Sequence, residues 1–333
     1  MKISYQYFFS KGLRNKRFFI SRKQSYHGCT THSLSLGDRP NLNFYKNILS
    51  KNCFHISEHN YLRHKKNNET EDDYSKRSAQ ELENKILKLG PDNVCAFVVE
   101  TIAGGLIGDV PSSKNYLKYV RKICDKYDIH LILDEVWCGT GTSGKSFCFD
   151  WDGITPDFVF ISKTLAAGYG ALSAVVTKNK IINKIYQKFG QINYSNTHQG
   201  HSLSVAAALE VQNIIQKKEF LSITQAKGKF FRLILENELK NNDFFYNVRG
   251  RGMRNSLEYK TPNNQLFGSL LKNYAFEKKI FLDAKWHRVC FPVSLQISKR
   301  EIEKNLDIFI GIFKNIQKNW PKLKKSKMRN YVF

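Results

Sequence analysis

The segment that decides the fold runs from Leu131 to Val176 and reads LILDEVWCGTGTSGKSFCFDWDGITPDFVFISKTLAAGYGALSAVV. It predicts three short apolar strands that alternate with two glycine-rich turns. The first strand ends on Asp134, and the second ends on Ser162 and Lys163. A carboxylate and an amine are therefore expected at the ends of neighbouring strands.

In an open α/β sheet, ligands bind outside the carboxyl ends of the strands, so Asp134 and Lys163 would face one crevice. An acid after a strand is more often a helix cap or a surface carboxylate, and most lysines in a chain with 53 Lys and Arg are solvated. The two groups together, however, suit a pyridoxal phosphate site. The lysine condenses with the cofactor aldehyde, and the acid keeps the pyridine nitrogen protonated so that the ring accepts electrons.

The same segment resembles the class III aminotransferases, which are fold-type I pyridoxal phosphate enzymes. Their signature is Asp-Glu-Val after a strand, then G-x-G-x-x-G, then T-P-D, and then S/A-K-x-L-x-x-G-Y. The matching positions are Asp134–Val136, Gly139–Gly144, Thr155–Asp157, Ser162–Leu165 and Gly168–Tyr169. The resemblance implies an α/β fold with a mainly parallel sheet in a large domain and a smaller C-terminal α/β domain. It also implies pyridoxal 5'-phosphate as the cofactor.

The resemblance implies roles for residues outside this segment. Tyr26 would lie against the face of the cofactor ring, with His27 beside it, and Glu100 would lie near the cofactor. Thr197 would reach the cofactor phosphate of the partner subunit in a homodimer, and Arg288 would bind the substrate carboxylate. The residues alone also allow simpler interpretations. Tyr26 could pack in the core, and His27 could be a structural histidine. Thr197 could cap a helix, and Arg288 could be a solvated cation.

The activity implied by the resemblance is transamination between an amino donor and a 2-oxo acid, with Lys163 and Asp134 as catalytic residues. The alternative is a truncated or decayed homologue without turnover. Met1 falls just after the place where the family has a Gly-Ser-Glu-Ala turn that holds the cofactor phosphate. Thr142 stands where the family commonly has arginine, and Trp137 stands where many members have glutamine. We therefore expect weak phosphate anchoring in the chain as it stands.

The formal net charge of +24 raises the question of nucleic acid or an anionic membrane as a partner. The basic residues are scattered through every segment, so nucleic acid is not expected, and the best remaining candidate for such contact is Lys322 to Arg329. No run of about 18 uncharged apolar residues predicts a membrane span. Seven dispersed cysteines without a CxxC pair indicate reduced thiols, no metal and a cytoplasmic location.

The chain before its first acid, Asp38, is rich in Lys, Arg, Ser and Phe, which is the composition of a mitochondrial transit peptide. The resemblance begins within this stretch, near Phe19, so we expect it to belong to the folded protein. A helix is expected at Ile3 to Phe9 and a strand at Arg17 to Arg22. From about residue 224 the composition becomes that of a smaller α/β unit. We place a cofactor-binding large domain at 1–223, a small domain at 224–320 and a basic tail at 321–333.

Residues Lys51 to Lys76 are polar and lack apolar periodicity, so they predict a long surface loop. Ser78 is expected to cap a helix that ends at Gly90. A strand, Val94 to Val99, and an amphipathic helix, Lys114 to Asp128, then lead into the segment quoted above. This alternation of strands and helices predicts a largely parallel sheet.

Overall fold

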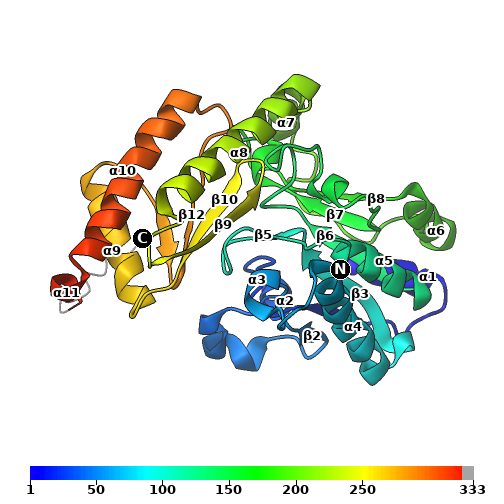
Figure 1. Cartoon of the computed structure of the whole chain (residues 1–333). Helices are drawn as coiled ribbons and strands as arrows, with labels where there is room; N and C mark the ends of the chain where they lie inside the picture. The colour runs from blue at the N-terminus through cyan, green and yellow to red at the C-terminus, as the bar shows by residue number, and fades with distance from the viewer. Residues whose placement is uncertain (325–333) are drawn as a thin grey trace. The chain divides into compact units, whose positions relative to one another are not determined.

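A computed structural model describes residues 1–324, apart from the side chains of Pro40 and Asn41. The chain divides into two compact units (Figure 1). Unit 1 comprises residues 1–106, 112–140 and 146–216, and unit 2 comprises residues 107–111, 141–145 and 217 onward. Most of the predicted basic tail, residues 325–333, lies outside the described residues. Within the described part, no helix is long and apolar enough to cross a membrane.

Unit 1 is built on a six-stranded sheet with the strand order β2-β1-β3-β6-β7-β8. The strands are β1 (Phe18–Arg22), β2 (Cys53–Ile56), β3 (Val94–Glu100), β6 (His130–Asp134), β7 (Phe158–Ile161) and β8 (Ala174–Thr177). The pairings among the first five are parallel, and β8 runs antiparallel to β7. The predicted mainly parallel sheet is therefore confirmed.

Helices cover both faces of this sheet because successive side chains of a strand point to opposite faces. Phe97 and Val99 of β3 belong to a core cluster shared with α4 (Glu71–Leu89) and α5 (Tyr116–Lys126). Ala96 and Val98 belong to another cluster, shared with α1 (Lys2–Ser10) and α6 (Asn179–Phe189). The predicted helix near Ile3 and the strand near Arg22 are thus both present.

The structure corrects the prediction of a surface loop over Lys51 to Lys76. Cys53–Ile56 forms β2, the edge strand that pairs in parallel with β1, and α4 begins at Glu71 rather than near Ser78. The side chain of Thr70 caps α4 by accepting a hydrogen bond from the backbone N–H of Asp73. Three acids then occupy the first turn, where the helix dipole favours negative charge. The start of the helix was not predicted because its first turn is polar and shows no apolar periodicity.

The other segments of unit 1 are short, apart from one long helix. They are α2 (Thr31–Leu36), α3 (Tyr61–His64), β4 (Ile102–Ala103), α7 (Ser202–Ile215) and the 3₁₀ turns Pro40–Ile48, Pro91–Asn93, Cys148–Trp151 and Lys163–Leu165. The helix α4 ends at Leu89, and Gly90 follows with φ +80°, as the predicted stop requires. The last 3₁₀ turn begins on Lys163, directly after β7.

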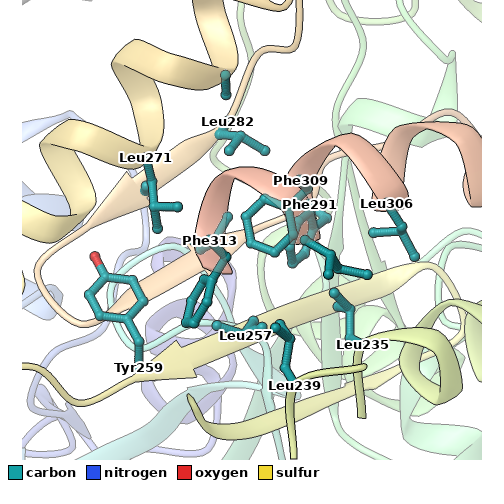
Figure 2. Packing of buried hydrophobic residues seen from close by; sticks show 14 of the residues in the cluster. Leu235, Leu239, Leu257, Tyr259, Leu271, Leu282, Phe291, Leu306, Phe309 and Phe313 are labelled. Atoms are coloured by element: carbon teal, nitrogen blue, oxygen red, sulfur yellow. The ribbon is translucent and has the colours of Figure 1, made fainter. Parts of the chain in front are cut away.

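Unit 2 contains an antiparallel sheet with the strand order β11-β12-β10-β9 and three long helices. Its elements are β5 (Val110–Pro111), α8 (Lys218–Leu239), β9 (Phe245–Arg251), β10 (Arg254–Tyr259), α9 (Asn264–Glu277), β11 (Asp283–Lys285), β12 (Arg288–Cys290), α10 (Lys299–Lys318) and α11 (Trp320–Leu323). Figure 2 shows Phe309 and Phe313 of α10 packing over Leu257 of β10. Unit 2 therefore has a hydrophobic core of its own.

Candidate functional site

Two carboxylates stand side by side at the carboxyl edge of the unit 1 sheet. Glu100 ends β3 and Asp134 ends β6, and the parallel register pairs these two positions. Both are largely buried, with 7% of each residue exposed. Burial raises the pKa of Glu100 to about 7, and the nearby charge of Asp134 acts in the same direction. The Glu100 side chain also accepts a hydrogen bond from the backbone N–H of Gly104 (3.3 Å).

Asp134 is held in a fixed orientation by two hydrogen bonds. His27 Nδ1 lies 2.8 Å from Asp134 Oδ2, and the backbone N–H of Val136 donates to Asp134 Oδ1 at 3.1 Å. Only 1% of the His27 side chain is exposed. Its other ring nitrogen, Nε2, is buried and has no hydrogen-bond partner among the described residues. The predicted neighbours Asp134, His27 and Glu100 therefore lie together.

Lys163 follows β7, the strand next to β6 in the sheet. Its backbone has φ +48°, a left-handed conformation that residues with a side chain seldom adopt. Its exposed side chain carries Nζ to 4.9 Å from the centre of the Trp137 ring. Backbone strain of this kind persists where the surrounding structure imposes it, and it gathers at functional sites.

Tyr26 comes one residue before His27 and is partly buried. The guanidinium carbon of Arg39 lies 3.7 Å from the centre of the Tyr26 ring, a cation–π contact that covers one face of the ring. Sequence reasoning missed Arg39 because the contact depends on how residues 28–38 fold back. It also missed Arg22, whose Nη2 donates to the backbone carbonyl of Glu100 (2.8 Å) and so supports the end of β3.

Glu135, the second acid of the pair after β6, has a structural role. It accepts hydrogen bonds from Thr101 Oγ1 and from the backbone N–H groups of Cys148 and Phe149, at 2.7 to 2.9 Å. Burial raises the pKa of Glu135 to about 7, while these hydrogen bonds favour its carboxylate form. The two neighbouring acids thus have different partners. Asp134 is hydrogen-bonded to His27, and Glu135 anchors the backbone at Cys148 and Phe149.

Thr197 is exposed and lies five residues before α7 begins at Ser202. The simpler interpretation of Thr197 as a helix cap is wrong, because His201 is the residue that caps α7. His201 Nδ1 accepts from the backbone N–H of Ser204 (3.3 Å). The role of Thr197 toward a phosphate stays a prediction.

Arg288 lies in unit 2, on β12, with 1% of the residue exposed. Its Nη1 donates to the backbone carbonyl of Asp283 (3.1 Å) and pairs with Asp283 Oδ2 (3.2 Å). The alternative of a solvated arginine is therefore wrong. Its assignment to a substrate carboxylate stays a prediction.

Unit 1 thus combines a parallel α/β sheet with an oriented, buried carboxylate and a lysine at the ends of adjacent strands. Ligands of α/β proteins bind at this edge of the sheet, outside the carboxyl ends of the strands. The sequence model of the Aminotransferase class-III family matches residues 1–313. The chain belongs to this family.

Curated relatives agree with this assignment. An aminotransferase of Gibberella zeae is 33% identical over 288 residues, which are 85% of this chain and 56% of that protein. An uncharacterized aminotransferase of Schizosaccharomyces pombe is 35% identical over 291 residues, which are 85% of this chain and 63% of that protein. The chain thus spans less than two thirds of these two relatives. Gamma aminobutyrate transaminase 2 of Solanum lycopersicum is 30% identical over 341 residues, covering 98% of this chain and 73% of that protein.

Solved structures place the fold in the same class. The omega transaminase from Pseudomonas jessenii in complex with PMP matches with a TM-score of 0.90 and 27% sequence identity. The match covers 96% of this chain and 72% of that one. The predicted fold-type I architecture is thereby confirmed.

Proposed function

We propose that this chain carries out pyridoxal phosphate-dependent transamination, in which an amino group passes from an amino donor to a 2-oxo acid. The observation that carries the proposal is the placement of Asp134 and Lys163 at the carboxyl ends of the neighbouring parallel strands β6 and β7. Membership in the class III family and the likeness to a transaminase in complex with PMP, the amino form of the cofactor, support it.

The residues at this edge suit the cofactor. Asp134 is a buried carboxylate that two hydrogen bonds orient, which is what a protonated ring nitrogen requires. The buried Nε2 atom of His27 has no partner among the described residues, so the site still has hydrogen-bonding capacity to offer. Lys163 supplies an exposed primary amine at the end of the next strand. When bound, pyridoxal phosphate supplies a ring that withdraws electrons from the substrate carbon.

Asp134 is assigned to holding a proton on the ring nitrogen. Its negative charge would stabilise the positive nitrogen, and its hydrogen bonds with His27 and the N–H of Val136 hold the carboxylate in one orientation. Glu100, beside it, has a pKa raised to about 7 by burial, so much of it is neutral near pH 6. A neutral Glu100 leaves Asp134 as the main negative charge at this place.

Lys163 is assigned to covalent attachment of the cofactor and to proton transfer at the substrate carbon. Its strained backbone fixes where the side chain leaves the main chain, and the ring of Trp137 lies beside Nζ. Tyr26, with Arg39 on one face, is assigned to stacking through its other face. Arg288 is assigned to binding the substrate carboxylate, which would replace Asp283 as the ion-pair partner of the guanidinium group.

We also propose that the chain forms a homodimer. Large apolar side chains are exposed on unit 1, including Leu203 (75% exposed) and Leu209 (64%) of α7 and Val175 (48%) of β8. Large exposed apolar groups favour a protein partner. Thr197, just before α7, would then hold the cofactor phosphate of the partner subunit.

The five buried cysteines carry free thiols, which supports a cytoplasmic location.

The test is amino transfer from a panel of amino donors to pyruvate in the presence of pyridoxal phosphate, measured as alanine formed. The protein should catalyse transfer from at least one donor, and Lys163→Ala should lower that rate by at least about a thousandfold. Lys145→Ala is a matched control outside the proposed set of catalytic residues and should retain activity. Equal rates for the protein and Lys163→Ala would refute the assignment.

A further inference from the structure

A cavity of about 410 Å³ lies at the carboxyl ends of β1 and β2, away from the residues assigned above. These two strands are parallel, so they end at the same edge, where α/β sheets form crevices. Its volume is in the range of small-molecule pockets. The polar and charged residues that line it include Lys23, Ser57, Glu58, His64, Arg77 and Glu81.

Glu58 is the unusual member of this lining. Only 9% of its side chain is exposed, so it is a nearly buried carboxylate. Its Oε1 atom lies 2.6 Å from His64 Nε2. Its Oε2 atom is buried and has no hydrogen-bond partner among the described residues. Oε1 also lies 3.9 Å from Arg63 Nη1, so the charge of Glu58 is partly balanced on that side, whereas burying the Oε2 oxygen without a donor is costly.

The other charged groups of the lining are satisfied, with one exception. Arg77 donates through Nε and Nη2 to Glu69, and Glu81 Oε2 accepts from the backbone N–H of Ser57 (3.1 Å). The exception is Lys23, an exposed residue whose ammonium group forms no ion pair or hydrogen bond in the described structure. Among the described residues, the cavity lining thus has one carboxylate oxygen without a donor, Glu58 Oε2, and one cation without an ion pair, Lys23.

We propose that this cavity is a second binding site, for a small dipolar molecule that carries both an ammonium group and a carboxylate. The ammonium group would donate to Glu58 Oε2, and the carboxylate would pair with Lys23. Free amino acids and ω-amino acids belong to this chemical class. The inference does not depend on the proposed function, because none of the cavity residues is assigned to cofactor or to catalysis.

A calorimetric titration tests this site with probes that separate the two charges. Glycine, β-alanine and 5-aminopentanoate carry both charges, whereas pentylamine and pentanoate each carry one. At least one dipolar probe should bind, and both single-charge probes should bind at least about tenfold more weakly. Lys163→Ala should bind the same dipolar probe with unchanged affinity, which separates this site from the proposed active site.

Two variants locate the ligand. Glu58→Gln keeps the shape of the side chain and removes its charge, so it should weaken binding by about tenfold to a hundredfold. Lys23→Ala should weaken binding by about fivefold, since this lysine is exposed. Glu83→Gln, on α4 but outside the cavity lining, is the matched control and should bind normally. The proposal is overturned if no dipolar probe binds at concentrations on the order of 10 mM. It is also overturned if the protein and Glu58→Gln bind the probe with equal affinity.

Discussion

Charged groups are buried at both the amino and the carboxyl edge of the unit 1 sheet, but the hydrogen bonds of these groups differ between the two edges. At the amino edge, Lys16 is 2% exposed, and its Nζ approaches the backbone carbonyls of Val94 (3.3 Å), Tyr127 (3.1 Å) and Asp128 (2.8 Å). These carbonyls lie where β3 and β6 begin. The ammonium group therefore joins the starts of two strands to the segment before β1.

The second charge at the amino edge, Asp157, is equally well matched. It accepts from Arg121 Nη1 (2.7 Å), from the backbone N–H of Leu131 (2.9 Å) and from Lys178 Nζ (3.1 Å). Both carboxylate oxygens therefore have partners. Asp157 and Lys16 fix the starting points of the strands, and neither has a polar atom left to offer a ligand.

At the carboxyl edge, His27 Nε2 is buried without a hydrogen-bond partner among the described residues, and burial raises the pKa of Glu100 to about 7. Lys163 has a strained backbone at the same edge. Each of these costs free energy in the folded chain alone. We infer that the buried charges of Lys16 and Asp157 serve stability, because they join the starts of the strands, and that the groups at the carboxyl edge serve the proposed binding.

The largest expected effect is on stability at the amino edge. Lys16→Met removes the buried ammonium group and its hydrogen bonds to one buried and two partly buried carbonyls, so the free energy of unfolding should fall by about 3 to 5 kcal/mol. Urea denaturation measures this change. The control is Lys11→Met, which removes an exposed ion pair with Asp128 and should cost less than about 1 kcal/mol. A loss of the same size in both variants would break the comparison.

The next effect is on chemistry at the carboxyl edge. Asp134→Asn should lower the single-turnover rate of amino transfer by about a hundredfold to a thousandfold, because a neutral amide cannot stabilise the protonated ring nitrogen. The asparagine can still accept from the N–H of Val136, so folding should be preserved. The control is Asp125→Asn on α5, an exposed residue. A single-turnover rate that stays unchanged in Asp134→Asn would remove the assigned role.

A third effect depends on pH and concerns Glu100. Its pKa is about 7 in the folded chain and ordinarily 4.5, so its contribution to stability is fully present below pH 4.5 and is lost as the pH rises through 7. The difference in unfolding free energy between the protein and Glu100→Gln should therefore shift by about 2 to 3 kcal/mol from pH 4.5 to 8, in favour of the variant at high pH. Denaturation curves across this range decide it, and a difference that does not change with pH would contradict it.

The smallest effect is again at the amino edge, where Asp157 has several partners. Lys178→Ala removes a partly exposed ion pair, and Arg121 and the N–H of Leu131 remain bound to the carboxylate. The free energy of unfolding should fall by no more than about 1 kcal/mol. Thermal unfolding measures this change. A larger loss would mean that the partners of Asp157 do not substitute for one another.

The sequence predicts most of the carboxyl edge because its groups directly follow buried apolar strands. Glu100, Asp134 and Lys163 all stand at such positions. The edge strand β2 was missed because three of its four residues are only partly buried and polar residues flank the strand, so it carries little apolar signal. The contacts of Arg39 with Tyr26 and of Glu58 with His64 depend on how loops and short helices fold back, which no periodicity encodes.

The most direct measurement of the central claim is to locate the cofactor on the chain. The protein is incubated with pyridoxal phosphate, reduced with borohydride and digested, and the peptides are analysed by mass spectrometry. We predict that one phosphopyridoxyl group is attached at Lys163, the lysine at the end of β7, and that Asp134→Asn weakens this labelling at low cofactor concentration. Labelling spread over many surface lysines, or concentrated on a lysine other than Lys163, would contradict the account.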